Sequence, residues 1–159
     1  MPGPARWEAP FPKVLLIACS EGRLQQPLTE FMAHDERLAR ADRVMLPGGP
    51  GALVARPGRE AAAALASEAC RFLVEAHGIE EVVLVFHGAA PDGPGAAVCG
   101  AYNEWYPEAS PEQLLRLQQS DCLEAAHLAR TWSHGTSVRA FRAEVAPDGT
   151  VNHVPMASL

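Results

Sequence analysis

The 159-residue chain is long enough for one domain with a full hydrophobic core and too short for two domains of ordinary size. Its 48% hydrophobic and 20% charged residues are typical of soluble globular proteins, and no apolar run approaches the ~18 residues that span a bilayer. A formal charge of −6 argues against nucleic acid, because phosphate binding needs a basic face. We therefore expect a single domain over residues 1–159 that acts on a small molecule and contacts neither nucleic acid nor membrane.

The residues before Lys13 contain no apolar stretch that could serve as a signal peptide, so we expect a cytoplasmic protein. Four cysteines in a chain without a secretion signal are better interpreted as free thiols or metal ligands than as a disulfide framework.

The first third of the chain predicts two strands and a helix. Residues 14–18 form an apolar run that is typical of a parallel strand covered on both faces. Residues 27–39 predict a helix, because one face gathers Leu28, Phe31, Met32, Asp35 and Leu38. A second strand is expected over residues 43–46, and the glycines and prolines of "PGGPGAL" predict a loop without regular structure.

The segment "GREAAAALASEACRFLVEAHG" is the clearest helix, with Gly78 as its stop signal. Its apolar stripe runs through Leu65, Ala69, Phe72, Leu73 and Ala76. A third strand follows over residues 82–86 and is again apolar on both faces. This βαβαβ order predicts a parallel sheet with right-handed crossovers and a ligand site at the carboxyl ends of its strands.

The last third predicts a helix and a hairpin. Ser110, Pro111 and Gln113 form the pattern of a capping box, so a helix should begin there and reach Trp132. Residues 136–156 then alternate around a Pro-Asp-Gly turn, as a hairpin or edge strand would. The fold class that we predict is α/β in three layers, a parallel sheet between helices with a C-terminal antiparallel edge strand or hairpin.

Potential metal ligands follow two of the three predicted strands. Cys19 ends the first and His87 ends the third, and parallel strands bring both side chains to one edge of the sheet. Cys99 comes twelve positions after His87, across a Gly/Pro-rich loop that can fold back. Two thiolates and one imidazole are a donor set of catalytic zinc sites, which leave the fourth position to water. The sequence therefore predicts Zn²⁺ on these three residues.

Glu21 and Arg23 lie close enough to Cys19 to form an ion pair beside the metal. Arg23 would keep the carboxylate ionised, so that Glu21 either accepts a hydrogen bond from zinc-bound water or competes for the open coordination position. Zinc lowers the pKa of its water from ~15.7 towards ~7, which gives hydroxide at neutral pH. This arrangement is that of a hydration or hydrolysis site.

With these residues, the sequence resembles the β-carbonic anhydrases. Their Cys-x-Asp-x-Arg motif is similar to Cys19-Ser20-Glu21-Gly22-Arg23, with Glu in place of Asp, and their His-x-x-Cys-Gly motif is similar to His87 and Cys99-Gly100 with an insertion between them. The resemblance extends from about Lys13 to the final hairpin.

The resemblance implies a β-carbonic-anhydrase-like core with zinc on the two cysteines and the histidine. It also implies that Glu21 and Arg23 act as the dyad at the open site, in a lyase that reversibly hydrates carbon dioxide to bicarbonate by zinc-bound hydroxide. A homodimer or larger homo-oligomer is expected on the same ground.

Other interpretations stay open. The same fold could hold zinc without catalysis, or hydrolyse another small substrate. Cys19 could be a nucleophile at a helix start, but phosphatase-type loops place Arg six positions after Cys, whereas Arg23 is four after. The full glycine fingerprint of dinucleotide loops is absent.

The remaining cysteines and histidines are expected outside the site. Cys70 and Cys122 lie inside predicted helices and are expected to pack in the core. The remaining histidines are expected at the surface or at helix ends: His34, His77, His127, His134 and His153.

Overall fold

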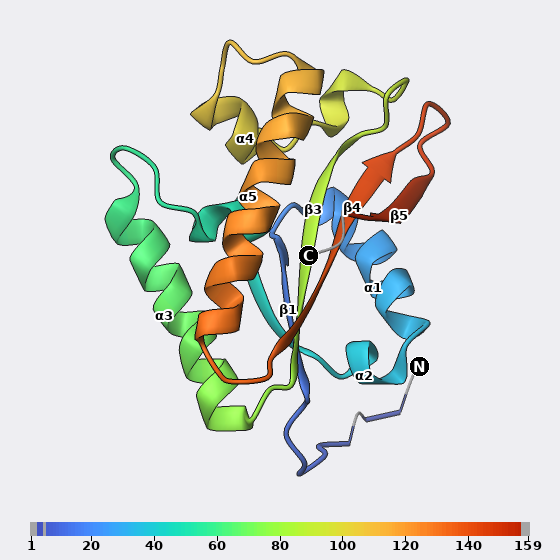
Figure 1. Ribbon diagram of the computed structural model, residues 1–159. Helices are drawn as coiled ribbons and strands as arrows, with labels where there is room; N and C mark the ends of the chain where they lie inside the picture. Colours follow the sequence, from blue (N-terminus) through green and yellow to red (C-terminus); the bar gives the residue numbers. More distant parts are fainter. Residues whose placement is uncertain (1–2, 5, 157–159) are drawn as a thin grey trace.

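The computed structural model describes residues 3–4 and 6–156, and a five-stranded sheet runs through the centre of this part of the chain (Figure 1). The strand order is β2-β1-β3-β4-β5. β1 pairs in parallel with β2 and β3, β3 pairs in parallel with β4, and β4 pairs antiparallel with β5. The strands are β1 Val14–Cys19, β2 Asp42–Leu46, β3 Glu81–Ala89, β4 Ser137–Val145 and β5 Val151–Pro155. This confirms the predicted parallel sheet with an antiparallel C-terminal edge.

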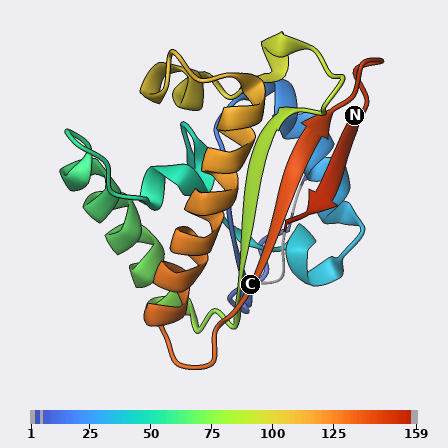
Figure 2. The same cartoon turned by 45° about the horizontal axis from the view of Figure 1, so that its top comes forward.

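Helices cover both faces of the sheet, as Figures 1 and 2 show. α1 (Gln25–Ala33) and α2 (Glu36–Ala39) lie on one face, and α3 (Glu60–His77) and α5 (Pro111–Thr131) lie on the other. Short elements follow the strands at their carboxyl ends: η1 Gly22–Leu24, η2 Gly49–Leu53, η3 Gly95–Ala97 and α4 Gly100–Trp105. Within the described residues, no helix combines the length and the apolar character needed to cross a membrane.

Two hydrophobic clusters separate the sheet from its helices. Leu28, Met32 and Leu38 from α1 and α2 pack on alternate residues of β1 and β3, and the larger cluster on the opposite face holds Cys70 and Val74 of α3 with the inner side of α5. Residues 14–17 and 82–84 are fully buried. Burial on both faces explains why these strands are continuously apolar in sequence.

The predicted helix ends are confirmed where local chemistry sets them. Ser110 caps α5 by accepting a hydrogen bond from the Gln113 backbone N–H, and the Gln113 side chain accepts one from the Ser110 N–H. Gly78 ends α3 with φ 63° and ψ 47°, a left-handed conformation that glycine adopts without a Cβ clash.

Three predicted elements differ in the structure. The single helix over residues 27–39 is wrong, because Asp35 leaves helical geometry and caps α2 by accepting from the Arg37 and Leu38 N–H groups. "GGPGAL" forms the 3-10 helix η2 instead of an irregular loop. The third strand is longer than predicted, since β3 pairs with β4 as far as Ala89, so His87 lies inside the strand rather than at its end.

The apolar stripe predicted along α3 faces solvent. Leu65, Ala69, Phe72 and Ala76 are exposed, and Leu73 is half-buried. The core contacts come instead from Ala63, Cys70 and Val74, with Ala66 and Leu73 at the margin: a second apolar face on the same alanine-rich helix. Because α3 is apolar on both faces, periodicity alone could not tell which one packs on the sheet.

Candidate metal centre

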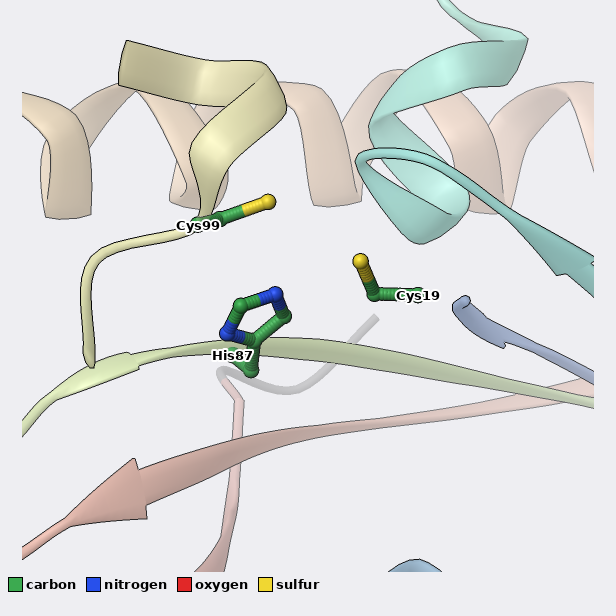
Figure 3. A group of neighbouring side chains, drawn as sticks. All are labelled: Cys19, His87 and Cys99. Carbon is green, nitrogen blue, oxygen red and sulfur yellow. The ribbon is translucent and has the colours of Figure 1, made fainter. Parts of the chain in front are cut away.

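Cys19, His87 and Cys99 converge at the carboxyl ends of β1 and β3 (Figure 3). One potential ligand atom from each residue, two sulfurs and a ring nitrogen, lies within 4.8 Å of the others. Around a tetrahedral zinc with Zn–S bonds of about 2.3 Å, two sulfurs stand about 3.8 Å apart. A zinc ion therefore requires only a small contraction of this group.

Each of the three residues is brought to the centre by a different element. Cys19 is the last residue of β1, His87 lies on the neighbouring strand β3, and Cys99 is the N-cap of α4. The η2 turn packs directly against the end of β1: a Cβ built on Gly49, whose φ is +57°, would lie 2.9 Å from the Cys19 backbone nitrogen. A glycine there lets the turn approach the backbone that carries the thiol.

The thiols of Cys19 and Cys99 shift each other's pKa in opposite directions. A hydrogen bond from Cys99, with smaller contributions from His87, lowers the pKa of Cys19 to about 4 against the opposing effect of burial. The same contact with Cys19, together with burial, raises the pKa of Cys99. One sulfur is thus ready to bind a cation as thiolate, and the second must lose its proton when a metal binds.

The His87 ring is a buried polar group that lacks a hydrogen-bond partner. The residue is 3% exposed, and neither ring nitrogen makes a hydrogen bond within residues 3–4 and 6–156. Leaving a buried nitrogen unsatisfied costs free energy that a metal bond would recover. The donor set and this unpartnered imidazole both fit a zinc ion.

The Glu21 carboxylate lies beside this ring and is held by Arg23. Glu21 Oε2 is 3.5 Å from His87 Nε2, and Oε1 forms an ion pair with the Arg23 guanidinium. The Glu21 side chain is 19% exposed, whereas that of Arg23 is 65% exposed. The backbone carbonyl of Glu21 also accepts a hydrogen bond from Gln25 Nε2 at 2.8 Å, and the same nitrogen donates to the Cys19 carbonyl at 3.1 Å. The structure thus places the Glu21 carboxylate beside the three candidate ligands and the Arg23 guanidinium at the solvent-exposed edge of the metal centre, which we call its rim.

The long segment between His87 and Cys99 folds back over this rim. Arg23 Nη2 donates to the Ala96 carbonyl at 3.1 Å, and a Cβ on Gly93 would lie 2.1 Å from the Val145 carbonyl oxygen of β4. A cavity of about 220 Å³ remains between this segment, the β4–β5 hairpin and Glu21, and its walls are largely apolar: Leu24, Pro94, Ala96, Ala97, Val145 and Val151. The segment between His87 and Cys99 therefore forms one wall of a pocket and does not fill it.

Two buried polar residues that the sequence analysis missed hold the backbone of His87. Gln118 Nε2 on α5 donates to the His87 carbonyl at 2.8 Å, and Arg142 Nε on β4 donates to Gln118 Oε1 at 2.8 Å. Arg142 Nη1 also donates to the Ala89 carbonyl at 3.1 Å and forms an ion pair with Glu144. The available signal was a polar Gln118 on the inner face of a helix, four residues after the buried Leu114.

A second buried polar group supports α4, which carries Cys99 at its start. Asp121 of α5 accepts hydrogen bonds from Arg56 and from the Tyr102 hydroxyl, and both charged side chains of the pair are about nine-tenths buried. Arg56 also lies over the Trp105 ring, 4.3 Å from its centroid. Desolvation, together with smaller like-charge effects, raises the pKa of Asp121.

The remaining cysteines and histidines lie outside the three-residue group. Cys70 and Cys122 are buried in helices, as predicted, and burial raises their pKa values to about 12 and about 11. His34, His127 and His134 are exposed, and His77 lies at the end of α3, stacked on Phe11. The predicted surface position of His153 is wrong: it is half-buried, because its ring stacks on Phe31 of α1 at 4.2 Å.

Comparison with known sequences gives no match: no protein-family model matches this chain, and neither does a curated protein. Solved structures do match. A β-carbonic anhydrase of Trichomonas vaginalis superposes with a TM-score of 0.54 at 11% identity, over 99% of this chain and 90% of that chain. A carbonic anhydrase of Streptococcus mutans gives 0.53 at 14% identity, over 96% and 87%.

A third structure, the β-carbonic anhydrase of Aspergillus fumigatus, gives a TM-score of 0.52 at 17% identity, over 94% of this chain and 78% of that chain. Structural matches at sequence identities this low show a shared fold and do not show a shared activity. These superpositions extend over 94–99% of this chain, so the likeness covers the sheet together with the helices on both of its faces. The chain therefore has a divergent form of the β-carbonic anhydrase fold.

Proposed function

We propose that this protein is a zinc-dependent lyase that reversibly hydrates carbon dioxide to bicarbonate and a proton. The observation that carries the proposal is the convergence of Cys19, His87 and Cys99 within 4.8 Å, around a buried imidazole that has no hydrogen-bond partner among the described residues. These three side chains would hold the ion. Bound zinc would supply Lewis acidity, which lowers the pKa of water from ~15.7 to ~7.

Glu21 would orient the attacking water. Its carboxylate lies beside His87 and is ion-paired with Arg23, so that it can accept a hydrogen bond from the water and direct a lone pair at the substrate. Arg23 is tied to Glu21 and to the Ala96 carbonyl, which limits the carboxylate to a narrow range of positions.

The cavity next to Glu21 suits a small uncharged substrate. Its side-chain walls are mostly aliphatic, including Leu24, Val145 and Val151, and the charged groups at its edge are Glu21 and Arg23. Carbon dioxide is apolar enough to enter such a space without losing hydrogen bonds to water. The bicarbonate product is charged and is favoured outside these walls.

A second function has one specific observation in its favour. Glu21 is longer than the Asp of the related motif by one methylene, and its Oε2 lies only 3.5 Å from His87 Nε2. A carboxylate in that place could itself fill the fourth zinc position, and the metal would then only fasten β1, β3 and α4 together.

Stopped-flow hydration of carbon dioxide by the zinc-loaded protein, between about pH 6.5 and 9, separates the two functions. For the lyase we expect hydration well above the buffer rate, a loss of at least tenfold in Glu21→Gln, and no change in Glu30→Gln, an exposed acid of α1. If wild type does not exceed the buffer rate and Glu21→Ala does, Glu21 occupies the metal and the second function holds. Buffer rates for both proteins would contradict the lyase.

A further inference from the structure

The sulfurs of Cys19 and Cys99 lie within 4.8 Å of each other, and both cysteines are free thiols. Figure 3 shows the two sulfurs pointing into the same space beside the His87 ring. A disulfide has an S–S distance of about 2.05 Å, so the two sulfurs would have to approach each other by less than about 3 Å. The closeness that suits a zinc ion therefore also suits a covalent bond between the two sulfurs.

Cys99 is the member of this pair that can make the movement. Cys19 is held in place, because it ends a strand that pairs with β2 on one side and with β3 on the other. Cys99 lies outside the sheet, as the N-cap of the six-residue helix α4. A Cβ built on the next residue, Gly100, would meet nothing within 4 Å. Rotation of the Cys99 side chain between staggered conformations, with a small shift of this backbone, can thus close the gap.

We propose that Cys19 and Cys99 form a reversible disulfide when hydrogen peroxide oxidises the metal centre, and that this disulfide and a bound zinc ion exclude each other. Cys19 is half-buried, whereas Cys99 is 2% exposed, so peroxide meets Cys19 first. The Cys19 thiolate attacks one peroxide oxygen. An S–O bond forms, the O–O bond breaks, and the leaving hydroxide takes up a proton to become water.

Cys99 completes the reaction because its sulfur lies next to the oxidised one. It attacks the Cys19 sulfur, so that the S–S bond forms and the S–O bond breaks. The hydroxide that leaves takes the Cys99 proton and becomes a second water. The two sulfurs together lose two electrons, which reduce one peroxide to two waters. A dithiol reductant reverses the change by exchange with the disulfide.

Zinc and the disulfide compete for the same two sulfurs. Zinc binds cysteine as the thiolate, whereas a disulfide sulfur carries no negative charge. Zn–S bonds of about 2.3 Å also keep two sulfurs about 3.8 Å apart, which is too far for a covalent bond between them. Oxidation would therefore remove two of the three candidate ligands and leave only His87. The consequence for activity rests on the proposed lyase: peroxide would switch hydration off, and a dithiol reductant would restore it.

Cys70 and Cys122 provide the internal comparison. They lie inside α3 and α5, are 0% and 2% exposed, and do not belong to the three-residue group. A thiol in an apolar interior stays protonated and is inert. We therefore expect these two cysteines to stay reduced under peroxide that oxidises Cys19.

Thiol counting on the chelator-treated protein tests the disulfide. After incubation with hydrogen peroxide, we expect the thiols that react under denaturing conditions to fall from four to two, and peptide mapping to join Cys19 to Cys99 within one chain. The variant Cys70→Ser, Cys122→Ser should form the same link. In Cys99→Ser, a sulfenic-acid reagent should label Cys19 instead. A wild-type protein that keeps four thiols, carries Cys19 to the sulfinic acid with Cys99 still free, or forms its links between chains would overturn the proposal.

Zinc release tests the exclusion. Peroxide added to the zinc-loaded protein should release zinc to a zinc-binding dye at about one ion for every two thiols lost, and a dithiol reductant should restore binding. Bound zinc should slow the loss of thiols by at least about tenfold, because the metal-bound sulfur is no longer a free nucleophile. An oxidised protein that keeps its zinc would overturn the exclusion. Neither measurement uses hydration, so a disulfide in a protein without lyase activity refutes only the lyase, and an active lyase without the disulfide refutes only this proposal.

Discussion

Gln118 joins the metal centre to the core, and its removal gives the sharpest prediction for the residues behind the ligands. Replacing it with leucine keeps the volume and deletes two buried hydrogen bonds, one to the His87 carbonyl and one from Arg142. Leaving the His87 carbonyl without this partner costs about 1–3 kcal/mol. Losing the hydrogen bond from the charged Arg142 costs towards the lower end of about 1.5–3 kcal/mol, because Arg142 keeps its other partners. Burying the leucine returns about 1 kcal/mol.

We therefore expect Gln118→Leu to lower the free energy of unfolding by about 2–3 kcal/mol in the metal-free protein. Urea unfolding followed by tryptophan fluorescence, in the presence of a chelator, measures this difference. Gln119→Leu is the matched control, because Gln119 is the next residue on α5 and is exposed, and surface changes stay within about 0.5 kcal/mol.

The same variant should weaken zinc binding by about 10–100-fold, since groups that orient a metal ligand contribute on this scale. A chelator competition titration gives this ratio independently of stability. If Gln118→Leu unfolds like Gln119→Leu and binds zinc as tightly as wild type, the hydrogen bond to the His87 carbonyl does not position the imidazole and the reasoning is refuted.

Three further changes test other parts of the structure. Asp35→Ala removes the cap of α2 and should lower the free energy of unfolding by about 1 kcal/mol at pH 7. Hydrogen bonds in the folded state lower the pKa of Asp35 despite burial, so the difference between wild type and variant should shrink as the pH falls below the unfolded pKa of about 3.9. A difference that stays constant with pH would contradict this. Gly93→Ala should destabilise by about 1–3 kcal/mol, since its Cβ would meet a backbone oxygen of β4, whereas Gly95→Ala, with open space around it, should be neutral in thermal unfolding. Arg56→Met should lower the free energy of unfolding, measured in urea, by about 3–5 kcal/mol, because it leaves the Asp121 carboxylate buried without its ion-pair partner. A loss below about 1 kcal/mol would show that the Arg56–Asp121 pair is not desolvated.

The sheet and most helices could be predicted because their signals are local. Apolar runs gave β1 and the centre of β3, and a capping box gave the start of α5. Where an element depends on its neighbour, sequence reasoning was wrong. β3 continues past its apolar run because β4 offers backbone partners as far as Ala89, and that extension moved His87 inside the strand.

The candidate site was predictable in its members and not in its surroundings. Cys19, His87 and Cys99 follow from residue type, strand context and the resemblance, and the structure brings them together. The hydrogen bonds of Gln118 and Arg142 depend on how β3, β4 and α5 align in three dimensions, which no local pattern encodes. The packing face of α3 could not be predicted either, because this helix is apolar on both faces and only the tertiary structure shows which face meets the sheet.

X-ray absorption at the zinc edge of the metal-loaded protein tests the central claim most directly. We predict one zinc per chain with two sulfur ligands at about 2.3 Å and a nitrogen ligand at about 2.0–2.1 Å, from Cys19, Cys99 and His87. The double variant Cys19→Ser, Cys99→Ser should lose the sulfur shell, and Cys70→Ser, Cys122→Ser, at the two core cysteines, should keep it. A zinc shell of oxygen and nitrogen alone in the wild type, or sulfur ligands that survive the first variant, would contradict the assignment.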